Sequence, residues 1–229
     1  QLDPVALNAE LRETGRIQIP NFLEAATADY LYTLLKENRD WYITYNEGEE
    51  NYESPMAEFQ ALDPAKKRQF MSRVLSSARQ GFQFLFRQYY ISRAVENGEN
   101  PGHPLHAMMD FVNSESTLQW MRTLTGQEQI RRSDSYASLY APGDFLTTHD
   151  DLHGSHDRVA AYVISMTKDW NPNWGGYLAF FDEEDNIEQA FMPSFNTLNL
   201  FLIPQKHAVQ MVSPFAGTMR TSYLGWLHQ

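Results

Sequence analysis

The sequence predicts an α+β fold, in which helices of the N-terminal half support a β-core built by the C-terminal half. Residues 1–130 contain stretches whose apolar residues recur at helical spacing, so this half is expected to be mainly helical. Residues 131–229 contain short runs of β-branched and aromatic residues separated by Pro, Gly, Asn and Asp, which is typical of a sandwich or barrel. A chain of 229 residues that is 42% hydrophobic can close one sizeable core, so we expect a single domain over residues 1–229.

The first 60 residues are expected to begin with a helix, a strand and a second helix. VALNAELRETG has helical spacing and stops at Gly15, RIQIPNFL is typical of a short strand, and a helix follows at about 25–39. Residues 46–58 are acidic, contain glycine and lack a long apolar pattern. This segment is expected to form a loop or a hairpin.

Two longer helices are expected next. Asp63 and Pro64 are typical of a helix start, an N-cap followed by proline at the first helical position. The apolar residues after them share one side of a helix and predict a long helix, bent near Gly81; they are Phe70, Val74, Ala78, Leu85 and Tyr89. Another helix is expected at about 104–125, ending at Gly126. The expected strands that follow are YASLY, RVAAYVISMT, GGYLAFFD, NTLNLFLIP, HAVQMV and TMRTSYLGWL.

Composition excludes several classes of function. The chain contains no cysteine, so any transition metal must be bound by imidazole and carboxylate. A net charge of −11 argues against direct nucleic-acid binding, and acidic residues outnumber basic ones in 1–60 and in 133–229, which favours a basic substrate. No apolar run approaches the roughly 20 residues needed to span a bilayer, so we expect a soluble, cytoplasmic protein without membrane contact.

The segment YAPGDFLTTHDDLHGSH carries three of the seven histidines of the chain. If residues 146–151 are extended, His149 and Asp151 point to one face and Asp150 to the other, although a bulge could reverse the two aspartates. H-x-D then supplies two ligands of one metal. A site of two histidines and one carboxylate with open positions is typical of non-haem Fe(II). His153 and His156 are expected to be loop residues, and His103 and His106 capping or surface residues.

Downstream, His207 begins HAVQMV and Arg220 lies in TMRTSYLGW. In a hairpin folded about Phe215, Arg220 would lie a few residues beyond His207 along the sheet, close to the span of a short dicarboxylate that chelates a metal at one end. Arg220 would bind the other carboxylate with two parallel hydrogen bonds, and Ser222 on the same face could add a hydroxyl. The alternative is a surface arginine with a carboxylate neighbour, but its apolar flanks favour a pocket. Trp226 would line the same pocket.

At this point the sequence resembles a known family, the 2-oxoglutarate and Fe(II)-dependent dioxygenases, and within them the prolyl hydroxylases. The resemblance rests on Y-x-x-G-x-x-L-x-x-H-x-D (Tyr140 to Asp151), K-D-W with G-G-x-L (Lys168 to Leu178), and H-x-V with R-x-S and W (His207 to Trp226). It covers about the last 95 residues. The stretches HDDLHGSHDRVAAYVISMTKDW and FMPSFNTLNLFLIPQKHAVQMV look most like the catalytic domain of the prolyl hydroxylases that act on a ribosomal protein.

The resemblance implies a double-stranded β-helix, or cupin-like jelly roll, as the catalytic β-core of residues 131–229. It implies Fe(II) bound by His149, Asp151 and His207. The distal carboxylate of the cosubstrate 2-oxoglutarate would lie on Arg220, with a supporting hydroxyl from Tyr140. The implied reaction consumes O2 and releases succinate and CO2, with ascorbate as a supporting reductant. The chain departs from the hypoxia-sensing relatives at Ser165, where those carry a tyrosine.

Three functions remain open on the sequence. The first is hydroxylation of a prolyl residue in a basic protein or peptide, such as a ribosomal protein or a translation factor. The second is the same chemistry on free proline or another small molecule. The third is a non-catalytic β-barrel module that binds a metal or ligand; Arg220 argues against it, because a structural metal site has no need of a guanidinium several ångströms away.

Overall fold

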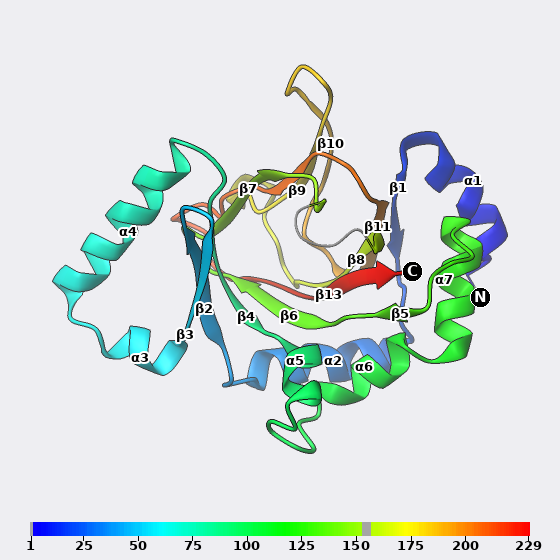
Figure 1. Ribbon diagram of the computed structural model, residues 1–229, viewed down its shortest axis with the longest axis horizontal. Helices are drawn as coiled ribbons and strands as arrows, with labels where there is room; N and C mark the ends of the chain where they lie inside the picture. Colours follow the sequence, from blue (N-terminus) through cyan, green and yellow to red (C-terminus); the bar gives the residue numbers. More distant parts are fainter. Residues whose placement is uncertain (1, 153–156) are drawn as a thin grey trace.

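The computed structural model describes residues 2–152 and 157–229, which fold into helices packed on a strongly curved sheet (Figure 1). The helices are α1 (Pro4–Thr14), α2 (Ala25–Glu37), α3 (Met56–Ala61), α4 (Pro64–Ala78), α5 (Ile91–Glu96), α6 (His106–Val112) and α7 (Glu115–Thr125), with a 3-10 turn at Pro172–Trp174. The strands of the N-terminal half are β1 (Arg16–Pro20), β2 (Tyr42–Glu47), β3 (Glu50–Pro55) and β4 (Phe84–Tyr89). The later strands are β5 (Arg132–Ser133), β6 (Tyr136–Tyr140), β7 (Phe145–His149), β8 (Arg158–Met166), β9 (Leu178–Phe181), β10 (Ile187–Phe191), β11 (Phe195–Leu202), β12 (His207–Val209) and β13 (Arg220–His228).

The sheet curls into a nearly closed barrel with two walls. The larger wall has the order β1-β11-β8-β13-β6-β4, and the smaller wall has the order β7-β12-β9-β10. Strand β4 pairs with both β6 and β7 and thereby joins the walls. Side chains of both walls form one apolar interior, which includes Phe86, Phe180 and Phe201. Burying each such ring contributes about 1.5–3 kcal/mol, so the interior stabilises the closed form. This is the predicted jelly roll.

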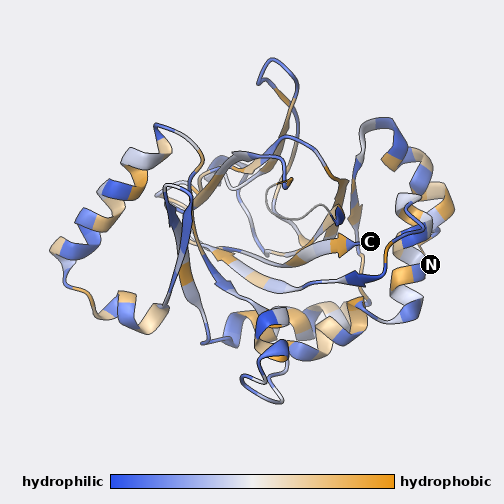
Figure 2. Cartoon of the chain, viewed as in Figure 1, coloured by the Kyte–Doolittle hydropathy of each residue, from blue (hydrophilic) through white to orange (hydrophobic). Residues whose placement is uncertain are grey.

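Helices cover the outer face of the larger wall. Helices α2, α5 and α6 lie beneath it, and α1 and α7 lie at its β1 edge (Figure 1). Leu31 and Leu35 of α2 share a buried cluster with Tyr223 and Leu227 of β13, because alternate residues of β13 point away from the barrel interior. Hydrophobic and hydrophilic residues alternate around these helices (Figure 2). The apolar sides of these helices therefore pack on the sheet, as expected for amphipathic helices. No helix in the described part of the chain is long and apolar enough to cross a membrane.

The acidic segment of residues 46–58 forms a hairpin, one of the two structures expected for it. Strands β2 and β3 pair from Tyr42–Pro55 to Glu47–Glu50, with the turn at Gly48 in a left-handed conformation (φ +63°). The hairpin extends the sheet, because β2 also pairs with β4. Helix α4 packs on it through Phe70, whose ring lies 4.8 Å from that of Tyr45. The hairpin thus lies beside the mouth of the barrel.

The long helix predicted through Tyr89 is wrong beyond Ala78. Helix α4 starts as predicted, with the Asp63 side chain accepting hydrogen bonds from the backbone of the first turn, but it ends at Ala78. Leu85 and Tyr89 lie in β4 instead. The run FQFLFRQYY is rich in aromatic residues, and β4 gains backbone partners in β2, β6 and β7. Pairing on both edges outweighs the helical spacing, which Leu85 and Tyr89 continue only by chance.

The helix expected at about 104–125 is interrupted at Asn113. The side chain of Asn113 bonds to the backbone of Ser133. It accepts a hydrogen bond from the Ser133 N–H (2.8 Å) and donates one to the Ser133 carbonyl (3.0 Å). Ser114 then caps α7 by accepting a hydrogen bond from the Thr117 N–H. Gly126 ends α7 in a left-handed conformation (φ 69°), as predicted.

The hairpin expected about Phe215 does not form. Strand β12 pairs with β7 and β9 in the smaller wall, whereas β13 pairs with β5, β6 and β8 in the larger wall. The chain therefore crosses from one wall to the other between His207 and Arg220. These two residues reach the interior from opposite walls, rather than along one hairpin.

Candidate metal centre

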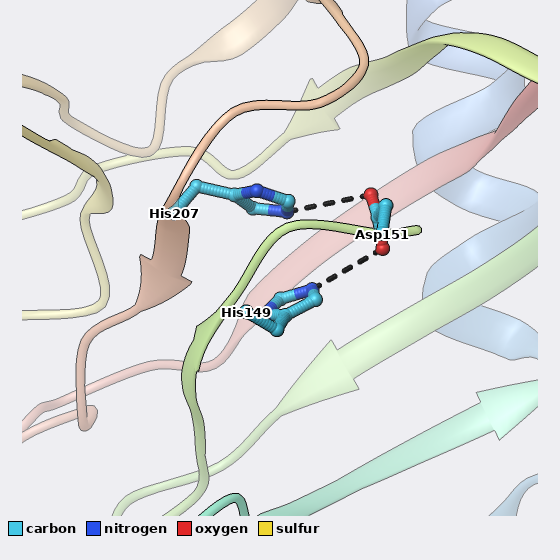
Figure 3. Close-up of side chains that lie close together, drawn as sticks. All are labelled: His149, Asp151 and His207. Atoms are coloured by element: carbon cyan, nitrogen blue, oxygen red, sulfur yellow. Dashed lines mark ion pairs between the residues drawn. The ribbon is translucent and has the colours of Figure 1, made fainter. Parts of the chain in front are cut away.

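Three potential metal ligands converge inside the barrel at the ends of two paired strands. His149 ends β7, His207 begins β12, and the two residues lie opposite each other in the ladder. Nε2 of His149 lies 3.3 Å from Oδ1 of Asp151, and Nε2 of His207 lies 3.5 Å from its Oδ2. Both imidazoles point at the carboxylate (Figure 3). Among the described residues, this is the one group of three such side chains whose ligand atoms all lie within 4.8 Å.

The other ring nitrogen of each histidine faces a backbone carbonyl. Nδ1 of His149 lies 3.0 Å from the Thr147 oxygen, and Nδ1 of His207 lies 2.8 Å from the Gln205 oxygen. A carbonyl can only accept, so each Nδ1 must carry the proton and donate it. Each Nε2 then presents a lone pair to the centre of the cluster. This is the orientation that metal-binding histidines require.

Asp151 reaches the cluster by a different route from the expected one. Strand β7 ends at His149, and the backbone of Asp151 has a left-handed conformation (φ 64°), so alternation along an extended strand does not place its side chain. Aspartate tolerates this conformation better than most residues do. Asp150 caps the local turn instead, because its carboxylate accepts a hydrogen bond from the Leu152 N–H (3.0 Å). Asp151, and not Asp150, meets the two histidines.

Protonation at neutral pH suits a divalent cation. Burial would raise the pKa of Asp151, but the hydrogen bond and the positive charges that the histidines supply in their protonated form, together with the Trp226 N–H, lower it to about 2. Burial, helped by the charge on His149, lowers the pKa of His207 to about 4. The cluster therefore offers a carboxylate and a neutral imidazole without having to release protons first.

The buried position of His207 predicts that the metal-free protein is less stable at about pH 5 than at about pH 7. The pKa of His207 is about 4 in the folded protein against an ordinary value of 6.5. In this window the unfolded chain binds a proton that the folded chain does not, so stability falls as pH falls, by about 2 kcal/mol from this residue. Urea unfolding of the metal-free protein at both pH values measures the loss. His207→Gln should show a smaller loss; equal losses would contradict the assignment.

The buried guanidinium of Arg220, on the larger wall, borders the same cavity as the cluster. Arg220 is 3% exposed, and its guanidinium carbon lies 5.1 Å from the centre of the Tyr140 ring, to which it is also paired across β13 and β6. Burial lowers the pKa of Arg220 and raises that of the Tyr140 hydroxyl. The Nε of Arg220 is buried without a hydrogen-bond partner among the described residues. Such a donor is costly unless a ligand satisfies it.

Two residues further along β13, and at the positions paired with it, lie buried serine hydroxyls. Ser222 pairs with Ser138 on one side and with Ser165 on the other. The hydroxyls of Ser222 and Ser138 are buried and lack hydrogen-bond partners in the described structure, whereas that of Ser165 accepts from the Ser194 N–H (3.1 Å). A guanidinium N–H and two hydroxyls without partners fit a carboxylate, which accepts several hydrogen bonds at once. The residues present therefore fit a carboxylate group, and Arg220 lines the same cavity as the three metal-ligand candidates.

A cavity of about 1230 Å³ connects the metal-ligand candidates with Arg220, whereas Ser222 and Ser138 are not among the residues that line it. It is lined by the three metal-ligand candidates, Tyr140 and Arg220, and it continues along the β2–β3 hairpin. Phe82 stands at its edge, half exposed, with its ring 5.6 Å from that of His149. Sequence reasoning missed Phe82 because it placed this residue inside a helix. The alternation of FQFLF was the signal that could have placed it beside a strand.

The other described histidines, His103, His106 and His228, are not part of the cluster. His103 accepts a hydrogen bond from the Leu105 N–H (3.2 Å) and so caps the local turn, as expected. His106 bonds to the Tyr89 hydroxyl (2.8 Å) within the helical layer, and burial lowers the pKa of both imidazoles. His153 and His156 lie outside the described residues.

Comparison with known proteins agrees with this geometry. Residues 135–228 match the model of the 2OG-Fe(II) oxygenase superfamily, and no curated protein matches the sequence. The fold is similar to that of a Pseudomonas putida prolyl-4-hydroxylase (TM-score 0.60, 20% identity, covering 99% of each chain). It is also similar to a Trichoplax adhaerens prolyl hydroxylase in complex with a hypoxia inducible factor peptide fragment (TM-score 0.65, 15% identity, covering 98% of this chain and 88% of that one). A third similar fold is a Burkholderia pseudomallei oxidoreductase of the 2OG-Fe(II) oxygenase family (TM-score 0.65, 16% identity, covering 100% and 92%).

Proposed function

We propose, from the membership of residues 135–228 in the 2OG-Fe(II) oxygenase superfamily, that this 2-oxoglutarate-dependent dioxygenase hydroxylates a prolyl residue in a protein substrate. Members of this superfamily use Fe(II), 2-oxoglutarate and O2. Together these supply the oxidising power that converts a C–H bond into C–OH, with succinate and CO2 as the other products. We further propose that residues 1–130 support residues 131–229 within one catalytic domain.

His149, Asp151 and His207 would hold the iron. Their protonation fits this task, because Nδ1–H of each histidine is fixed by a carbonyl and the carboxylate is ionised. Three protein ligands leave positions open for small molecules, unlike a closed structural site. Neither histidine has to act as a base, since both present a lone pair.

Arg220, Tyr140 and Ser222 would bind 2-oxoglutarate. Arg220 would donate two parallel hydrogen bonds to the distal carboxylate, and the hydroxyls of Tyr140 and Ser222 would complete its partners. The support for this role is the buried, unpartnered Nε of Arg220 beside the unpartnered Ser222 hydroxyl. The small Ser165, where hypoxia-sensing relatives carry a tyrosine, leaves room in the same row.

The size and course of the cavity are the observation that supports a polypeptide substrate. Small-molecule sites usually occupy about 300–1,000 Å³, and this cavity of about 1230 Å³ extends from the metal cluster along the hairpin. Phe82, Tyr90 and Trp226 line it and could pack against a proline ring. Glu49 lines its hairpin side, and the net charge is −11, which favours a basic segment beside the proline. The prolyl hydroxylases of similar fold, one of them with a bound peptide, support this substrate class.

Ribosomal proteins and translation factors are the basic, cytoplasmic substrates that we propose first, and we accordingly place the enzyme in the cytoplasm. The acidic net charge does not favour direct contact with nucleic acid. The closest rival is an oxygenase of free proline or another small molecule. A non-catalytic module with a structural metal is disfavoured, because it would not explain the buried guanidinium of Arg220.

Succinate formation tests the proposal. Purified protein is incubated with Fe(II), ascorbate, O2 and 2-oxoglutarate, with proline-containing peptides from ribosomal proteins and elongation factors, or with free proline. We expect peptide-dependent succinate and the mass gain of one oxygen atom on a proline. Each peptide is paired with a version in which alanine replaces that proline, which should abolish the stimulation. Stimulation by free proline alone would contradict the protein substrate.

A further inference from the structure

The carboxylate of Asp151 has a partner outside the metal cluster. The indole N–H of Trp226 donates to its Oδ2 at 3.0 Å. The two histidines lie on paired strands, but Asp151 lies beyond the end of β7 in a left-handed conformation. Strand geometry therefore fixes the imidazoles and leaves the carboxylate direction to be fixed by its side-chain contacts. Among these, the indole N–H of Trp226 is a hydrogen-bond donor that does not belong to a metal-ligand candidate.

Trp226 is itself held by contacts that do not involve Asp151. Its backbone N–H donates to Oδ1 of the buried Asp134 (2.6 Å). Its ring lies 5.5 Å from that of Tyr136, and the guanidinium carbon of Arg158 lies 3.7 Å from its centre. Trp226 also lies within β13, paired with Ala161 of β8. The indole N–H thus keeps its direction whether or not Asp151 is in place.

We propose that Trp226 is a positioning residue, whose indole N–H turns the Asp151 carboxylate towards His149 and His207 and so prepares the metal site before the metal arrives. This inference rests on the proposed metal site. Oδ2 uses a lone pair for the indole proton, while Oδ1, facing His149, remains available. Without the indole N–H, the buried carboxylate would lose a partner and could rotate. Losing such a supporting hydrogen bond typically weakens metal affinity by about 10–100-fold.

Trp226→Phe removes the N–H and keeps an aromatic ring against Tyr136 and Arg158. Co(II), used as the probe, is titrated by calorimetry into metal-free protein in the absence of 2-oxoglutarate. We expect the variant to bind Co(II) about 10–100-fold more weakly than wild type. Its visible absorption when saturated with Co(II) should also differ, because the carboxylate is no longer held in one orientation. A variant that is only less stable, with the metal ligands still in their wild-type orientation, would give the wild-type Co(II) spectrum.

Trp120→Phe is the matched control, because it also removes an indole N–H, one that contacts only the Leu2 carbonyl at 3.5 Å. It should bind Co(II) as wild type does. Thermal unfolding of the metal-free variants checks folding, and Trp226→Tyr replaces Trp226→Phe if the latter does not fold. Wild-type affinity and spectrum in the Trp226 variant would overturn the positioning role alone. Failure of wild type itself to bind Co(II) would overturn the metal site, and the positioning role with it.

Discussion

Asp151→Ala is expected to abolish 2-oxoglutarate turnover, whereas Asp150→Ala is expected to leave metal binding close to wild type. Asp151 is buried and its oxygens lie 3.3 and 3.5 Å from Nε2 of the two histidines. Removing it takes away the one negative ligand of the cluster and leaves two neutral imidazoles. We expect metal affinity to fall at least about 100-fold, beyond the range found for supporting residues. Asp150 caps a turn and is not one of the three clustered ligands.

Calorimetric titration with Mn(II) and succinate assays on both variants measure these effects. The pair of variants is matched, because both remove one carboxylate from neighbouring positions of one segment. Circular dichroism of the metal-free proteins should show the same fold in each. If Asp150→Ala lost the metal and Asp151→Ala kept it, the order of the two aspartates in the structure would be wrong.

Arg220→Ala is expected to raise the 2-oxoglutarate concentration needed for turnover by about 30-fold to several-thousand-fold, because truncating one partner of a buried charged pair costs about 2–5 kcal/mol. Metal affinity should change little, since Arg220 reaches the cavity from the wall opposite His207. Arg220→Lys keeps a positive charge but loses the two-pronged geometry, so its effect should be intermediate.

The requirement for 2-oxoglutarate is measured as KM from succinate formation, and metal affinity is measured separately by Mn(II) titration. A large rise in KM with unchanged Mn(II) affinity is the expected pattern. Equal losses of both would mean that Arg220 supports the structure and does not bind the cosubstrate.

The types of group at the site could be predicted from short local motifs, although the strand alternation assumed for Asp151 does not hold. His149 and Asp151 are separated by one residue, and Arg220 and Ser222 share a strand face whatever that strand pairs with. Helix ends were predicted for the same reason, since Asp63 and Gly126 act within one turn of their own position. In each case the physical cause lies within a few residues of the signal.

Other features depend on partners far away in the chain. Residues 84–89 form a strand because β2, β6 and β7 supply hydrogen bonds on both of its edges. His207 and Arg220 belong to different walls because their strands pair with β9 and β8, respectively. Local spacing contains no information about such pairings.

The sequence by itself determined the α+β class, the chain of β-prone runs after residue 131, and the set of imidazole, carboxylate and guanidinium groups that can bind a metal and a dicarboxylate. Only the tertiary structure decided which wall each group occupies, and that Trp226 bonds to Asp151 while Asp150 caps the local turn. The reason is physical. The identity of a side chain fixes what it can bind, but the direction in which it binds is set by strand pairing and by buried hydrogen bonds between residues far apart in the chain.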